Sequence, residues 1–224
     1  EDIFSVMKKY APEADKLPIK MIIWNDSELL LRIIEERMKR DGIIDIWSEF
    51  FCDSVDGMKT KEYLISRILP KPRDLITLVS SALENAINRK HSIIEERDII
   101  DATTKYSSFA YNTLITELQV EYSGIEDFLL NLLGDKAIIS EATLVIRMQE
   151  SGIAKEKTGE LLEMLCQMSF LGFEIRPGEF RFCYSSDDYK RYKILAQKLV
   201  SDGPEIKRYR IHTAFCAELM IEEY

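Results

Sequence analysis

Apolar residues recur at helical spacing through most of residues 25–123, and this periodicity limits what the first half of the chain can fold into. Pro70 and Pro72 cannot continue a helix, so one helix has to end before them. The next helix is expected to begin at Arg73 and to run to about Arg89. The pattern predicts a block of separate helices rather than a sheet over residues 25–123.

Two of these helices have an apolar face that we expect to pack in the hydrophobic core. Asp26 or Ser27 can cap the first one and Gly42 can end it. Its predicted core face consists of Leu29, Ile33, Ile34 and Met38. The predicted core face of the helix after Pro72 consists of Leu75, Ile76, Val79, Leu83, Ala86 and Ile87.

Four further helices complete this block. They are expected at residues 44–57, 59–69, 92–108 and 110–122. In the first of them, Trp47, Phe50 and Phe51 lie at helical spacing and are expected in the core. Ser92 and Glu95 have the spacing of a capping box, so they are expected to start the helix over 92–108.

The segment before this block has a different character. Residues 2–10 read as a short helix, and the compact apolar run over 19–24 reads as a strand. A single strand needs sheet neighbours, and no other good strand is predicted before residue 136. Residues 1–24 are therefore expected to be the end of a sheet domain that is supplied by sequence before Glu1.

Residues 124–224 alternate helices with short strands. Helices are expected at 124–135, 141–152 and 154–172, with an extended segment at 137–140 between the first two. Pro177 and Gly178 then form the turn of a strand–turn–strand unit. A helix over 187–200 and a basic strand running into a last helix over 205–219 follow. Helix, strand, helix, helix, hairpin is the order of a winged helix, which we predict for 124–224.

Composition and charge exclude several classes of protein. Hydrophobic residues make up 46% of the chain and charged residues 31%, which indicates a folded globular protein. No uncharged apolar run is long enough to span a bilayer, and no signal-peptide pattern is present, so we expect a cytoplasmic location without membrane binding. Four cysteines without a CxxC pair, and only two histidines, predict free thiols and no metal site.

The charge is uneven along the chain. The net charge is −9, and residues 136–224 carry 13 basic and 14 acidic residues, whereas the preceding part carries 17 basic and 25 acidic ones. A protein that reads nucleic acid usually presents a basic face. The first part argues against such a face, and the second part is close to neutral.

Enzymatic motifs are absent from this sequence. It has no GxxxxGK[ST] phosphate loop, no GxSxG, no HExxH and no GxGxxG. His91 and His212 fall in different predicted domains, so a nucleophile with a histidine base is not expected. We therefore predict no catalysis and no bound cofactor for this chain alone.

Arg73 is the residue with the most specific chemical interpretation. A cation is slightly unfavourable at a helix N-terminus, while the same end of a helix favours a bound anion. Arg73 follows Pro72 at such a position, so it can reach a phosphate or a carboxylate outside the chain. The alternative is a solvated arginine, or one that pairs with its neighbour Asp74.

The stretch LPKPRDLITLVSSALENA resembles the sensor-2 region of AAA+ ATPases, closest to the origin-recognition type and to the signalling and defence NTPases of the STAND class. SIIEERDIIDA is similar to the next element of their lid domain. IIWNDSELLLRIIEERM is similar to the junction where the chain enters the lid, with Trp24, Leu29 and Arg37 at matching places. KPRDLI and RIHTAF resemble the C-terminal half of bacterial P-loop ATPases found near phage-defence genes.

This resemblance implies a mainly α fold with three parts. Residues 1–24 would be the C-terminal end of a P-loop core, 25–123 a helical lid and 124–224 a winged-helix domain with a C-terminal extension. The missing core would bind ATP and Mg²⁺ and make the full-length protein an ATPase. Arg73, preceded by Pro72, would contact the outer phosphates of the nucleotide. The chain has Lys71 where many members have arginine, and Thr213 follows His212 where many have proline.

Direct DNA binding is one alternative function. The recognition helix would be residues 154–169, with Lys155 and Lys157, and the wing would be 173–184, with Arg176 and Arg181. Both elements also carry glutamates, so they offer no net positive charge for phosphate contacts. A better basic cluster lies outside them and consists of Lys190, Arg191, Lys193, Lys198, Lys207, Arg208 and Arg210.

A second alternative is a module for protein contacts. A neutral to acidic winged helix is suited to bind another protein, another protomer or its own ATPase core. We therefore expect a protein partner or a homo-oligomer, and leave DNA as the alternative partner.

Overall fold

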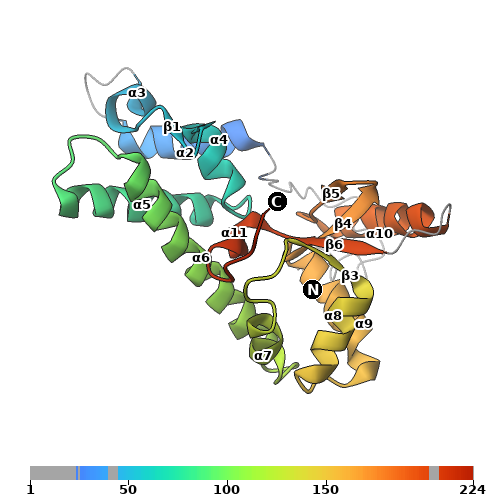
Figure 1. Cartoon of the computed structure of the whole chain (residues 1–224). Coiled ribbons are helices and arrows are strands. Elements are labelled where there is room, and N and C mark those ends of the chain that lie inside the picture. The colour runs from blue at the N-terminus through green and yellow to red at the C-terminus, as the bar shows by residue number, and fades with distance from the viewer. Residues whose placement is uncertain (1–23, 25, 40–44, 202–206, 224) are drawn as a thin grey trace, which may run out of the picture.

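The computed structural model describes residue 24 and residues 26–39, 45–201 and 207–223. The expected helix at 2–10 and strand at 19–24 fall almost entirely outside these residues. The described chain is mainly helical with two small antiparallel sheets, which confirms the predicted fold class. It forms two parts, which we call the helical half (residues 27–118) and the sheet half (residues 125–201 and 207–223), and Figure 1 shows them side by side.

The helical half consists of five helices and a short hairpin among the residues described. Its elements are α2 (Ser27–Met38), α3 (Ile46–Phe50), β1 (Ser54–Val55), β2 (Met58–Lys59), α4 (Thr60–Ser66), α5 (Pro72–Arg89) and α6 (Glu96–Leu118). The long helices α5 and α6 pack against each other, and α6 runs from the helical half down to the start of the sheet half (Figure 1).

Helix α2 begins as predicted but buries different residues. The Asp26 side chain accepts a hydrogen bond from the backbone N–H of Glu28 at 2.9 Å and caps the helix. The helix ends at Met38, and the predicted stop residue Gly42 lies outside the described part of the chain. Its buried residues are Leu30, Leu31 and Ile34, so the prediction that Leu29 faces the core is wrong.

The prediction of no further good strand before residue 136 is also wrong. Residues 54–59 form a two-stranded hairpin instead of continuing the helix expected over 44–57. Its turn residues Asp56 and Gly57 both have positive φ, of 49° and 73°. Asp-Gly is a strong hairpin signal because both residues tolerate this conformation. Each strand is only two residues long, too short for an alternating pattern to be visible.

Helix α5 starts at the predicted place. Pro72 occupies its first turn, and Lys90 ends it in the left-handed conformation with φ of 60°. Leu75, Val79 and Ala86 are buried as predicted, together with Leu78 and Ala82. The predicted core residues Leu83 and Ile87 are instead exposed, because the buried face of the helix is turned toward Leu78 and Ala82.

Helix α6 replaces two predicted helices. It is continuous over 23 residues, so the expected break between 108 and 110 does not exist. Its capping box is formed by Glu95 and Asp98, not by Ser92 and Glu95. The carboxylate of Asp98 is fully buried and also contacts Arg89 and His91, which ties the end of α5 to the start of α6.

The sheet half has the predicted helix–strand–helix–helix–hairpin order. Its elements are α7 (Ile125–Leu130), β3 (Ile138–Ser140), α8 (Glu141–Glu150), α9 (Lys155–Gln167), β4 (Leu171–Arg176), β5 (Glu179–Arg181), α10 (Ser186–Ser201), β6 (Arg208–Ile211) and α11 (Thr213–Cys216). The strand order is β3-β6-β4-β5. The C-terminal strand β6 therefore lies between β3 and the hairpin, paired antiparallel with both β3 and β4.

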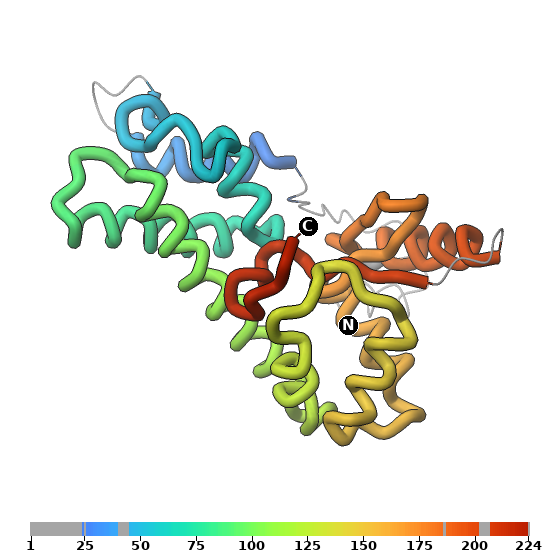
Figure 2. The backbone as a smooth tube through the Cα atoms, in the orientation of Figure 1, coloured from blue at the N-terminus to red at the C-terminus, as the bar shows by residue number. Residues whose placement is uncertain are grey.

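The C-terminal residues connect the two halves. Figure 2 shows this segment passing beside α6 after it leaves the sheet. Thr213 donates a hydrogen bond to the backbone carbonyl of Ser66, and Ser108 donates one to Glu218. Arg67 forms an ion pair with Glu223. The whole described chain is one packed unit, and the predicted boundaries at 24 and 123 stay predictions. None of the described helices is long and apolar enough to cross a membrane.

Candidate functional site

The candidate site is built around the first turn of α5. Lys71 is the residue before the helix and offers no side-chain cap, while Pro72 fixes the backbone at the helix start. The first backbone N–H groups of a helix have no intrahelical partner, and together with the helix dipole they create a positive end. Arg73 adds a full positive charge to this end and is exposed to solvent.

Arg73 and its neighbour Asp74 are held by two aromatic residues of α6. The guanidinium carbon of Arg73 lies 5.1 Å from the centre of the Phe109 ring. The hydroxyl of Tyr106 donates a hydrogen bond of 2.9 Å to the Asp74 carboxylate and accepts one of 3.0 Å from the backbone N–H of Leu69. Asp74 is therefore engaged by Tyr106, and Arg73 forms no ion pair with any residue that the structure describes.

The surroundings of Asp74 change its acidity. Burial raises the pKa of the Asp74 carboxyl, although the Tyr106 hydrogen bond and the nearby Lys71 and Arg73 act in the opposite direction. Burial and the adjacent Asp74 likewise raise the pKa of Tyr106 well above its usual range. The Tyr106 hydroxyl thus stays protonated and remains a donor to Asp74.

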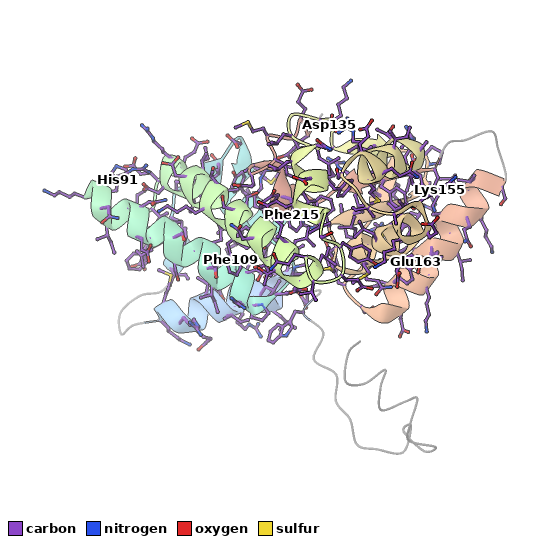
Figure 3. The ribbon with its side chains drawn as sticks, turned by 90° about the horizontal axis from the view of Figure 1, so that it is seen from below. His91, Phe109, Asp135, Lys155, Glu163 and Phe215 are labelled. Atoms are coloured by element: carbon purple, nitrogen blue, oxygen red, sulfur yellow. The ribbon has the colours of Figure 1, made fainter. Side chains whose placement is uncertain are left out.

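Arg73 borders a cavity of about 310 Å³ between the two halves. The start of α5 and residues of α6 form one side of it, and Gln167, Met168 and Phe215 form the other. Its charged lining residues are two cations, Lys71 and Arg73, and two carboxylates, Asp74 and Glu117. Figure 3 shows Phe109 and Phe215 where the halves meet, whereas His91 lies at the far end of the helical half. The cavity therefore brings the cation of α5 next to the C-terminal end of α9, the predicted recognition helix.

The basic residues of the hairpin and of β6 are mostly compensated within the chain. Arg176 and Arg181 both contact Glu179 in the hairpin. The Nε of Arg208 donates a hydrogen bond of 2.8 Å to the buried Glu174, and a second guanidinium nitrogen contacts the same carboxylate. Burial alone raises the pKa of Glu174, but the hydrogen bonds from Arg208 and from the backbone of Gly178 leave that pKa below its usual value.

The remaining cations predicted to contact DNA fall into two groups, those with partners inside the chain and those without an ion pair to a described residue. Three of these cations contact in-chain oxygens, as Lys193 does with Glu163, Lys207 with Glu141, and Arg210 with the carbonyl of Glu223. Lys157 lies over the Tyr122 ring at 5.5 Å. Within the described residues, no ion pair involves Lys155, Lys190, Arg191 or Lys198. The structure thus breaks the predicted basic cluster into a paired group and an exposed group on α10.

A larger cavity of about 780 Å³ lies in the helical half between α2, α3 and α4. Its charged residues are of both signs and include Glu28, Asp53, Lys59 and Lys61. The indole N–H of Trp47, which also borders the cavity, donates a hydrogen bond of 2.7 Å to Glu35. Asp45 and Glu62 also line the cavity, so four carboxylates outnumber two lysines and the lining has a net negative charge.

His212 and the four cysteines lie in positions that serve packing and helix capping. The Nδ1 of His212 accepts a hydrogen bond of 3.1 Å from the backbone N–H of Ala214 and caps α11. Burial lowers the pKa of His212 to about 3, so the ring is neutral. Cys166, Cys183 and Cys216 are buried, Cys52 is half-buried, and all four are free thiols. The described residues contain no cluster of His, Cys, Asp and Glu that could hold a metal ion.

Sequence reasoning identified Arg73 but missed its aromatic neighbour. Phe109 follows Tyr106 by three residues, which puts both on one face of a helix. That spacing was visible in the sequence, but the expected break before residue 110 hid the continuous helix. No sequence signal indicated that Gln167 and Met168 face the same cavity.

Residues 27–115 match the family model of the FunZ-associated C-terminal helical domain. This range extends from the first residue of α2 to near the end of α6, so the match covers nearly all of the helical half and none of the sheet half. The helical half is thus similar to a domain from the C-terminal part of a larger protein. No curated protein and no solved structure matches the chain.

Proposed function

We propose that this chain is the C-terminal regulatory part of an ATP-dependent molecular switch. In this proposal residues 25–123 are the lid, residues 124–224 are a winged-helix domain, and residues 1–24 complete a P-loop core that precedes them. The chain alone does not hydrolyse ATP. The full-length protein would be a cytoplasmic bacterial ATPase, and its resemblance to ATPases near phage-defence genes suggests a role in defence.

The observation that carries the proposal is that the exposed Arg73 side chain forms no ion pair with any described residue. Its guanidinium contacts an aromatic ring and no described carboxylate, at a helix end that already favours anions. An outer phosphate of ATP carries the negative charge and the oxygen geometry that arginine recognises with two hydrogen bonds. Arg73 and Lys71 are the two cations that would bind the phosphate, and Asp74 and Glu117 line the same cavity.

Arg73 would act by reporting whether an outer phosphate is present. Because α5 packs along α6 and α6 contacts α11, a shift of the α5 start can reach the sheet half. A change in nucleotide state would thus become a change in the position of the winged helix relative to the ATPase core. ATP, bound with Mg²⁺, would supply the phosphate charge that Arg73 contacts. The core that would bind ATP and Mg²⁺ lies outside this chain.

The complete protein provides the test of this role. Arg73→Ala is expected to slow ATP turnover by about tenfold or more, because a charged hydrogen-bonded contact is worth about 1.5–3 kcal/mol. Arg97→Ala is a matched control, since Arg97 is also an exposed arginine at the second position of a helix, α6. Equal turnover in wild type and Arg73→Ala would reject the sensor role.

We further propose that the sheet half binds protein rather than DNA. The pairing of Arg176, Arg181, Lys193, Lys207 and Arg208 with carboxylates supports this choice, because compensated cations contribute little to phosphate binding. The partner would be the protein's own ATPase core, another protomer or another protein. A salt-dependent band shift with duplex DNA at low salt would instead favour the DNA-binding alternative.

A further inference from the structure

Helix α6 holds two successive residues of α5 in different ways. Tyr106 binds Asp74 through a buried hydrogen bond with defined geometry. Phe109, one helical turn later, contacts Arg73 only through the face of its ring, and the ring itself is half-buried. The two aromatic rings lie 6.3 Å apart and are tilted by 40°. Asp74 is therefore fixed, whereas Arg73 is held by a contact that its side chain can leave without breaking a hydrogen bond.

The position over Phe109 places Arg73 at the junction of the two halves. The cavity beside it is closed on the other side by Gln167 and Met168, at the end of α9, and by Phe215 of α11. Met168 is the residue that ends α9, and its backbone N–H donates to the carbonyl of Met164. An arginine that lines this cavity and an arginine turned away from it thus present different surfaces to the end of α9.

Arg73 can contact either the Phe109 ring or a phosphate, and the stronger of these two contacts will prevail. A cation over an aromatic ring at a partly exposed site is held weakly. A bidentate arginine–phosphate contact is stronger and more directional. A phosphate that approaches the α5 start will therefore draw Arg73 away from Phe109.

We infer that Phe109 is a positioning residue that holds Arg73 at the edge of the cavity between the halves until a phosphate removes it. This inference rests on the proposed function of Arg73 and adds the place where its side chain stays in the absence of nucleotide. It also gives a route to the sheet half, because a departure of Arg73 from Phe109 changes the wall of the cavity that Gln167 and Met168 also line.

The first test needs no nucleotide and uses the chain described here. Protons above an aromatic ring are shifted upfield in an NMR spectrum, so the side-chain protons of Arg73 are expected to be shifted upfield in the wild type. Phe109→Leu, which keeps an apolar side chain, is expected to abolish the shift, and Phe109→Tyr to preserve it. Identical Arg73 resonances in wild type and Phe109→Leu would overturn the inference.

The second test uses the complete protein and ATP. Releasing Arg73 from its resting place is expected to raise ATP affinity by about twofold to fivefold in Phe109→Leu, the range set by a weak cation–aromatic contact. Phe109→Tyr should bind ATP as the wild type does. In an Arg73→Ala background, Phe109→Leu should have no effect on affinity. An equal effect in both backgrounds would mean that Phe109 acts only through packing, and the inference would be wrong.

The two tests separate this inference from the function on which it rests. If Arg73→Ala leaves ATP affinity unchanged, the sensor role of Arg73 fails, whatever the NMR spectra show. If Arg73→Ala weakens ATP binding but the upfield shift is missing, the sensor role stands and the resting place at Phe109 is rejected.

Discussion

Arg73 in the helical half and Arg208 in the sheet half have the same side chain in opposite settings. Arg208 makes two contacts with a buried carboxylate on the neighbouring strand, that of Glu174. Arg73 lies over the ring of Phe109 and forms no ion pair within the described part of the chain. An arginine whose charge is satisfied internally holds the fold together. One whose charge is not satisfied has the freedom to bind an anion from outside.

Two buried carboxylates, Glu174 beside Arg208 and Asp74 beside Arg73, differ in a similar way. Glu174 receives hydrogen bonds from a cation and a backbone N–H, which hold its pKa below the usual value. Asp74 receives one from a neutral hydroxyl, and burial raises its pKa. Glu174 is thus compensated by a cation, as is the buried Asp98 of the helical half by Arg89. At the start of α5, neither Asp74 nor Arg73 forms an ion pair with a described residue.

The largest effect expected from this comparison is on stability. Arg208→Gln leaves Glu174, which is 3% exposed, without its cation and should lower the free energy of unfolding by about 3 kcal/mol. Arg73→Gln removes no internal partner and should change it by less than about 0.5 kcal/mol. Denaturant unfolding of both variants measures the difference. Equal losses would show that Arg73 is as much a structural residue as Arg208.

A somewhat smaller effect is expected at the acidic partner in the sheet half. Glu174→Gln should lower the free energy of unfolding at pH 7 by about 2 kcal/mol, because it loses charged hydrogen bonds. The folded-state pKa of Glu174 lies below its ordinary value of 4.5. Its contribution is therefore complete above pH 4.5 and is lost as the pH falls toward the lowered value. The gap between wild type and Glu174→Gln should close over that range in pH-dependent unfolding experiments.

Asp74 should respond to pH with the opposite sign. Its raised folded-state pKa means that folding favours the protonated carboxyl, so wild-type stability rises as the pH falls through that raised value toward 3.8. Asp74→Asn keeps an acceptor for Tyr106 and should cost less than about 1 kcal/mol at pH 7. Asp74→Asn has no carboxyl to protonate at this position, so its free energy of unfolding should not show this rise as the pH falls. A pH response like that of Glu174 would contradict the difference between these two carboxylates.

The smallest effect is expected on the outer face of α5. Ile87 is 64% exposed, so Ile87→Ala should change the free energy of unfolding by less than about 0.5 kcal/mol. Thermal unfolding of this variant tests which face of α5 is buried. A loss above about 2 kcal/mol, typical of a core isoleucine, would show that Ile87 packs in the core as its spacing predicted.

Local signals predicted much of the fold. Proline fixed the start of α5, Asp26 the cap of α2, and the Pro177–Gly178 turn the hairpin, because each acts through its own backbone or its nearest neighbours. The assignment of Leu83 and Ile87 to the core failed because the buried face of α5 is turned toward Leu78 and Ala82, and helical spacing alone does not fix that rotation. The β1–β2 hairpin was missed because its strands contain two residues each.

The candidate site was predictable only in part. Arg73 could be identified because a proline next to an arginine at a helix start is a local pattern. Its contact with Phe109 joins residues on two helices, and Glu174 and Arg208 are separated by 34 positions in the chain. Contacts of this kind depend on the tertiary packing, which a single sequence does not reveal. The same holds for the central place of β6 between β3 and β4.

The affinity of the complete protein for ATP and for ADP tests the central claim most directly. If Arg73 contacts the outer phosphate, Arg73→Ala should weaken ATP binding by about tenfold or more and leave ADP binding nearly unchanged, since only ATP carries that phosphate. Arg97→Ala should leave both affinities as they are. An unchanged ratio of ATP to ADP affinity in Arg73→Ala would contradict the account and leave the exposed charge at the start of α5 without a role in nucleotide sensing.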